Sequence, residues 1–119
     1  MDYSKDIEVE MTFLPTECGG RKTAAKSGYY PQFYYDGHDW GARHNFIGTD
    51  IVYPGETVKA YLSFLSPKQY IGKLKESDIF LIREGINVVA YGKVIKIIEL
   101  EKSAKREIEK ELQNINKNK

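Results

Sequence analysis

Hydrophobic and polar residues alternate along two segments of the chain. From Ile7 to Phe13 the odd-numbered positions are apolar and the positions between them are polar or charged. From Val58 to Phe64 the even-numbered positions are apolar in the same way. A period of two residues is typical of a β-strand with one buried face and one wet face. Both segments are therefore predicted to be strands.

Turn-forming residues separate these and further strands. Pro54-Gly55 suits a turn in which proline presets φ at the second position and glycine accepts a positive φ at the third. Glu84-Gly85 suits a tight hairpin between the apolar run containing Phe80 and Ile82 and the β-branched run Val88–Ile98. Several short strands joined by such turns predict an all-β sandwich or barrel.

The aromatic segment Tyr29–Tyr35 is a further strand candidate, interrupted by a proline. Because Pro31 cannot donate a backbone hydrogen bond, an edge position or a bulge is favoured there. Exposed tyrosine rings could also stack on unpaired bases. By alternation we expect one set of side chains in the core, Tyr29, Phe33 and Tyr35, and the other set on the surface, Tyr30, Gln32 and Tyr34.

The pattern changes from period two to helical spacing after Leu100. The stretch 101–119 contains no glycine, proline or aromatic residue. We predict an amphipathic helix over about Ser103–Asn114, with its apolar stripe packed on the β-domain or, alternatively, on a partner. Residues 1–6 are then an N-terminal extension, 7–100 the β-domain, and 101–119 the helix and a polar tail. The stripe consists of Ala104, Ile108, Leu112 and Ile115.

Composition indicates one soluble globular domain. The chain has 119 residues, of which 41% are hydrophobic and 29% charged, and its net charge of +1 gives no global positive field for nucleic acid. The basic cluster Arg21, Lys22 and Lys26 is either a local patch or a solvated loop. No run reaches the roughly twenty apolar residues that span a bilayer, so we expect no membrane association. A single cysteine, Cys18, and an N-terminus without an apolar signal core favour a cytoplasmic location.

The glycines and cations between Glu17 and Lys26 do not form a phosphate-binding loop. The template G-x-x-x-x-G-K-[ST] needs a glycine where Pro15 stands, and Arg21 separates Gly20 from Lys22. The residues that follow include a glycine and a proline, which oppose the helix that such a loop requires. We therefore expect no bound nucleotide and no other cofactor.

Candidate catalytic and metal-binding residues are few. His38 and His44, with Asp36 and Asp39 nearby, match no zinc template, and we interpret them as an exposed polar hairpin without a metal. Cys18 as a nucleophile would need a neighbouring base and a lowered pKa, which the sequence does not indicate. We predict no catalytic residue and no enzymatic activity.

Four blocks of the chain, in order, resemble the C-terminal third domain of elongation factor Tu, the GTPase that delivers aminoacyl-tRNA. They read "GGRKT", "SGYYPQFYY", "VYPGETV" and "FLIREGINVVAYGKVIKI", and the resemblance covers approximately Ile7 to Ile98. It implies a closed antiparallel barrel of six strands without exposed edges. The predicted C-terminal α-helix is an addition to that domain.

The resemblance also implies binding residues, because the family's third domain holds the T-arm of tRNA largely through backbone and ribose contacts. Arg21 occupies the family's arginine in the loop after the first strand, and Lys22 replaces the usual histidine. Gln32 matches the glutamine of the "PQFY" block. Glu84 and Gly85 match the hairpin that meets the T-stem. These five residues are the candidate RNA- or partner-binding site.

The chain also departs from the family. Gly41 stands where the family has a tRNA-contacting threonine, and Asp36 and Asp39 make the same segment acidic. The nucleotide-binding and middle domains are absent from this sequence, so GTP hydrolysis is not expected. We predict a stand-alone, non-enzymatic module that binds a protein, either a translation factor or a toxin, including a decoy or immunity role. The alternatives are binding of tRNA or another structured RNA, and a remnant domain without a separate function.

Overall fold

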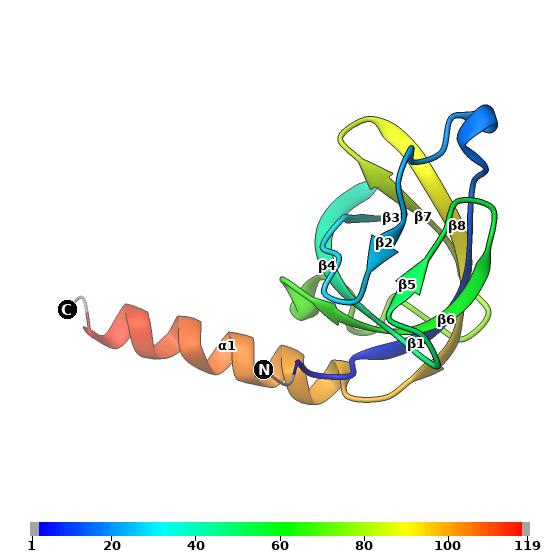
Figure 1. Ribbon diagram of the computed structural model, residues 1–119. Helices are drawn as coiled ribbons and strands as arrows, with labels where there is room; N and C mark the ends of the chain where they lie inside the picture. The colour runs from blue at the N-terminus through cyan, green and yellow to red at the C-terminus, as the bar shows by residue number, and fades with distance from the viewer. Residues whose placement is uncertain (1–2, 118–119) are drawn as a thin grey trace.

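Six strands form a closed antiparallel barrel in the computed structural model, which describes residues 3–117 (Figure 1). Neighbouring strands follow the order β1-β6-β4-β3-β7-β8, and β8 closes the barrel on β1. The predicted fold class, an all-β six-stranded barrel with a C-terminal helix, is thereby confirmed. The barrel strands are β1 (Ile7–Phe13), β3 (Gln32–Tyr35), β4 (His38–Phe46), β6 (Thr57–Phe64), β7 (Ile79–Glu84) and β8 (Asn87–Ile97).

Shorter elements complete the described chain. Two short strands, β2 (Ala25–Lys26) and β5 (Ile51–Val52), form an antiparallel pair beside the barrel (Figure 1). Two 3₁₀-helical turns span Thr16–Cys18 and Pro67–Gln69. The helix α1 (Leu100–Lys117) follows the last strand. Within residues 3–117, no helix has the length and apolar character needed to cross a membrane.

The barrel core contains the side chains that the alternation predicts. The odd-numbered residues of β1 and the even-numbered residues of β6 are buried. Phe33 is buried and stacks on Phe80 with ring centroids 4.6 Å apart, whereas Tyr29 and Tyr35 are partly buried against the same core. Tyr30 lies on the surface. The expected core set is thus confirmed, whereas of the expected surface set Tyr30 is exposed and Gln32 and Tyr34 are only partly exposed.

The predicted turns are present. Gly55 has φ of +89°, and the Glu56 amide donates to the Tyr53 carbonyl at 3.1 Å, which closes the Pro54-Gly55 turn. The β7–β8 hairpin pairs Glu84 with Asn87 across a loop of two residues, and Gly85 in that loop has φ of +62°. Gly85 thus adopts the left-handed backbone conformation that a two-residue hairpin loop favours.

The prediction of an exposed polar hairpin around His38 and His44 was wrong for the part that contains His44. Asp36 and Gly37 form the hairpin turn, and His38–Phe46 is the nine-residue strand β4, between β3 and β6. His44 is 0% exposed, and its ring centroid lies 5.6 Å from that of Tyr29. The inward positions of β4 include alanine and histidine, so the apolar alternation that identifies a strand is weak there.

Helix α1 is longer than predicted and projects away from the barrel (Figure 1). It begins at Leu100 rather than Ser103 and continues to Lys117. Leu100 and Ala104 are buried, but Ile108, Leu112 and Ile115 are exposed. The expectation that the apolar stripe packs on the barrel therefore holds only for the first turns of the helix. Beyond them the stripe stays exposed, although Lys68 of the second 3₁₀-helical turn still forms an ion pair with Glu111 of α1.

Candidate binding groove at the end of strands β3 and β7

A surface groove of about 530 Å³ lies where β3 begins and β7 ends. Four of the five predicted site residues line it: Arg21, Gln32, Glu84 and Gly85. Lys22 is exposed in the same loop as Arg21 but is not among the residues that form the groove wall. The remaining lining residues are Tyr29, Tyr30, Pro31, Gly41 and Arg83.

Strand register explains why these residues meet. Gln32 on β3 is paired with Gly41 on β4 and with Arg83 on β7, so the three lie in a row on the outer face of the barrel. Glu84 continues the inward parity of Phe80 and Ile82 and lies at the mouth of the barrel. Residues far apart in sequence are therefore brought together by the pairing of three strands.

Arg21 is held in the groove by an ion pair with Glu84. Its Nε atom donates to the Thr23 carbonyl at 3.2 Å, and the guanidinium lies 4.8 Å from the centre of the Tyr29 ring. The Tyr29 hydroxyl donates to the same Glu84 carboxylate oxygen. Partial burial lowers the pKa of Arg21, but the hydrogen bond and charge of Glu84 outweigh it and raise that pKa above its ordinary value.

Tyr29 serves as a hydrogen-bond donor to Glu84. Burial, followed by the hydrogen bond to Glu84, raises the pKa of Tyr29 above its ordinary value, so its hydroxyl stays protonated at neutral pH. The Glu84 carboxylate therefore receives hydrogen bonds from both Arg21 and Tyr29. This arrangement fixes the position of the hairpin that carries Gly85.

The second arginine of the groove is also paired with a carboxylate. The Nη1 atom of Arg83 lies 3.2 Å from Asp39 Oδ2, and its guanidinium lies 4.7 Å from the centre of the Tyr34 ring. Both guanidinium groups of the groove thus have an acidic partner, Glu84 for Arg21 and Asp39 for Arg83. Because the two charges of each ion pair lie so close together, their fields largely cancel for a ligand further away. The groove wall therefore presents little net charge.

Two buried polar atoms of the groove wall lack hydrogen-bond partners. Within residues 3–117, neither Gln32 Oε1 nor Arg83 Nε has one. A buried polar group without a partner costs free energy. A ligand or a water that supplied these bonds would stabilise the wall.

Tyr30 occupies the space above Gly41. A Cβ atom on Gly41 would lie 2.4 Å from Tyr30 Cε1, so only glycine permits the ring to lie there. The Arg43 guanidinium lies 4.5 Å from the centre of the Tyr30 ring and 4.5 Å from that of Tyr3. The surface where the family carries a threonine is therefore covered here by an aromatic ring that is stacked on an arginine.

The sequence reasoning missed Tyr30, Arg83 and Asp39 as parts of this site. Arg83 is next to the predicted site residue Glu84 in sequence, but its side chain faces the opposite side of β7. The alternation predicts Tyr29 in the core and Tyr30 on the surface, but it does not predict that both line one groove. The signal that would have found these residues is the register between β3, β4 and β7, which the sequence alone does not reveal.

No metal site is formed in the part of the chain that the structure describes. Over residues 3–117 there is no group of three or more His, Cys, Asp or Glu side chains that could hold a metal ion. Cys18 is exposed in a 3₁₀-helical turn. The groove offers hydrogen-bonding groups, paired charges and aromatic surface.

A comparison with protein families shows which family this chain resembles. The family model described as the elongation factor Tu C-terminal domain matches residues 1–98. The match includes every strand of the barrel and every residue that lines the groove. It ends before α1 begins at Leu100, so the helix lies outside it.

Proposed function

Because the chain belongs to the elongation factor Tu C-terminal domain family, we propose that it is a binding module of the translation apparatus that docks a protein partner in this groove. A translation factor, or a toxin directed at one, is the partner class. Its contact residues are Arg21, Gln32, Glu84 and Gly85, which line the groove, while Lys22 is exposed in the same loop as Arg21 and contributes little to binding of a protein. The observation that carries this proposal is that each groove arginine is already paired with a carboxylate.

Charge pairing favours a protein partner over RNA. Affinity for nucleic acid comes largely from cations that neutralise phosphates and release counterions. Arg21 and Arg83 are each compensated by an acid. Among the described residues, Lys22 in the loop of Arg21 and Arg43 beside the Tyr30 ring have no carboxylate oxygen within 4.0 Å, so two uncompensated cations lie beside the groove. Protein interfaces, in contrast, are enriched in tyrosine and arginine.

An exposed apolar side chain beside the groove supports the same choice. Ile86 is 85% exposed at the tip of the β7–β8 hairpin, next to Gly85. An apolar side chain gains free energy when a partner removes it from water, at roughly 25 cal/mol per Å². Phosphate and ribose offer it little of that gain, whereas a protein surface can bury it.

A pull-down with the immobilised full chain tests this function. We expect a specific protein to be retained from native lysate after RNase treatment, to be lost with Gln32→Ala, and to be kept with Lys22→Ala. Gln113→Ala, an exposed glutamine on α1, is the matched control and should retain the partner. Retention that disappears with RNase and with Lys22→Ala would refute the proposal.

Binding of tRNA or another structured RNA is the second candidate. One observation favours it: four residues that the family resemblance links to the tRNA T-arm line the same groove. In fluorescence anisotropy with labelled tRNA, weak binding with a shallow salt slope is expected of this candidate. Arg21→Ala with Lys22→Ala should flatten the slope, whereas Gln32→Ala should weaken binding and leave the slope unchanged. No binding at low salt would exclude this candidate, and a lack of any partner would favour a remnant domain.

A further inference from the structure

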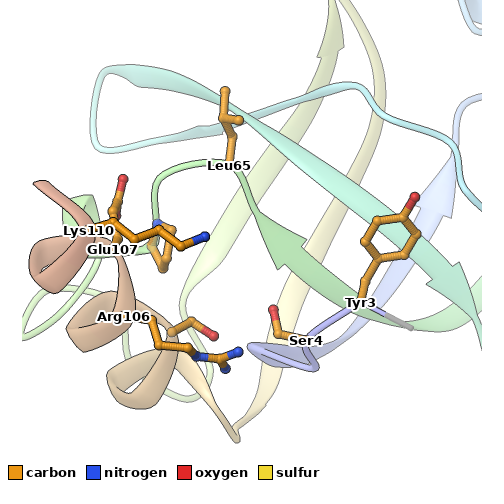
Figure 2. A pocket seen from close by; sticks show the side chains of 8 residues that line it. Tyr3, Ser4, Leu65, Arg106, Glu107 and Lys110 are labelled. Atoms are coloured by element: carbon orange, nitrogen blue, oxygen red, sulfur yellow. The ribbon is translucent and has the colours of Figure 1, made fainter. Parts of the chain in front are cut away.

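A second groove lies between α1 and the barrel, outside the site described above (Figure 2). Its volume is about 370 Å³, within the range of small ligand pockets. Arg106, Glu107 and Lys110 of α1 form one wall, and Tyr3, Leu65 and Pro67 contribute the other. The residues of the helix wall lie beyond the family match, which ends at residue 98.

The first turns of α1 are fixed against the barrel, so this groove is preformed. Asp6 is 0% exposed, and its carboxylate accepts hydrogen bonds from the Ser103 hydroxyl and, at 2.8 Å, from the Phe64 amide. Glu107 accepts from the Ser66 hydroxyl at 2.7 Å and from the Lys68 amide at 2.9 Å. A preformed site loses less conformational entropy when it binds a ligand.

The helix wall carries two cations without an acidic partner. Arg106 and Lys110 are four residues apart on α1, and Figure 2 shows both side chains extending from the helix toward the segment that carries Tyr3 and Ser4. Among the described residues, neither lies within 4.0 Å of a carboxylate oxygen. The carboxylate of Glu107 is the acidic group of the wall, and both of its oxygens already accept hydrogen bonds.

The opposite wall is apolar and exposed. Leu65 is 64% exposed at one end of the groove (Figure 2). Pro67, two residues further along the chain, is buried and also lines the groove. Tyr3 lies at the far side of Ser4 from the helix and is also exposed. The groove thus combines a cationic wall with an aliphatic and aromatic one.

We propose that this groove binds an acidic peptide segment of a partner protein, with its carboxylates on Arg106 and Lys110 and one large apolar side chain on Leu65. Charge complementarity selects the acidic residues, and the exposed leucine selects the apolar one. RNA fits less well, since two cations neutralise only two phosphates. Among the residues that line this groove, Tyr3 alone offers a ring for stacking, and the Arg43 guanidinium already lies 4.5 Å from the centre of that ring. This docking surface extends beyond the proposed function because it shares no residue with the first groove.

Selection of a displayed random-peptide library on the full chain tests the proposal. We expect enrichment of peptides in which Asp or Glu flanks a large apolar residue. A synthetic copy of the enriched peptide should lose affinity on the order of tenfold with Arg106→Glu and with Lys110→Glu, measured by fluorescence anisotropy. Lys102→Glu makes the same charge change on an exposed residue of the same helix that does not line the groove, and it should change affinity less than about twofold.

The apolar half of the site has its own matched pair of variants. Leu65→Gln should weaken the peptide, whereas Ile79→Gln, at a residue with the same exposed fraction of 64%, should not. The proposal is overturned if no acidic peptide is enriched, if Arg106→Glu leaves affinity unchanged, or if poly(U) displaces the peptide and binds in an Arg106-dependent way. Peptides sensitive to Gln32→Ala but not to Arg106→Glu would belong to the first groove, so the two proposals fail separately.

Discussion

Glycine and arginine set the local shape of the first groove. Gly41 leaves room for the Tyr30 ring, and the ring in turn lies against Arg43. Arg21 and Glu84 neutralise each other at the barrel mouth. The position of the Tyr30 ring depends on the absence of a side chain at Gly41, and the charge balance at the barrel mouth depends on Arg21 and Glu84. Single substitutions can therefore test these two features separately.

Substitution of two glycines, each with a Cβ contact below 3.0 Å, should differ in its cost to stability. Gly41→Ala meets the ring of Tyr30, a side chain that is 41% exposed and has solvent on one side to shift into, so we expect a loss below about 1 kcal/mol. Gly92→Ala meets the Glu10 carbonyl and the buried Phe80 ring, each at 2.6 Å, and should cost about 2–3 kcal/mol. Urea unfolding at neutral pH measures both. Equal losses would mean that Tyr30 is locked in place.

The buried His44 predicts a pH dependence of stability. Burial lowers the pKa of His44 to about 4, against the ordinary value of 6.5. Between these values the unfolded chain binds the proton and the folded chain does not, so stability is complete above pH 6.5 and falls as the pH drops toward 4. The loss from this residue is about 3 kcal/mol.

Urea unfolding between pH 7 and pH 4 measures that slope. His44→Phe should flatten it, since the site is aromatic and phenylalanine does not titrate. His38→Gln is the control, at an exposed histidine of the same strand, and should keep the wild-type slope. A wild-type slope in His44→Phe would show that other groups cause the dependence.

At the scale of elements, the sequence identifies strands whose alternation is strong, and it misses β4, whose alternation is weak, and the two-residue strands β2 and β5. The run from Ile7 to Phe13 became β1 with the predicted faces, whereas β4 was missed because alanine and histidine occupy inward positions. The helix was predicted, but its docking was not, since it depends on Asp6, a residue assigned to an N-terminal extension. Contacts between such distant segments are set by tertiary packing, which period and propensity do not encode.

Truncation separates the docked part of α1 from the projecting part. Removal of residues 112–119 takes away the exposed side chains of residues 112–116 and no described barrel contact, so stability should change by less than about 0.5 kcal/mol. Removal of residues 103–119 takes away the Ser103 hydroxyl from Asp6 and the Glu107 contacts. It should leave a folded barrel that is less stable by about 2–4 kcal/mol. Thermal unfolding followed by circular dichroism measures both, and equal midpoints would mean that the docked turns contribute nothing.

At the scale of the whole molecule, the two grooves differ in their relation to the family match. The first groove consists of residues within the family match, and the second depends on a helix beyond it. The family blocks were enough to predict the barrel and four residues that line one groove. They were not enough to predict the charge balance of that groove, because Asp39 and Arg83 meet only through the pairing of β3 with β4 and β7.

Photocrosslinking at the hairpin tip tests most directly whether the first groove binds protein. A diazirine-bearing residue in place of Ile86 reacts with protein and RNA alike, and its exposed position beside Gly85 lies at the edge of the groove. We predict adducts that contain a specific protein, resist RNase and disappear with Gln32→Ala, while the same probe at exposed Tyr53 gives none. Adducts that contain RNA and disappear with Lys22→Ala would contradict the account.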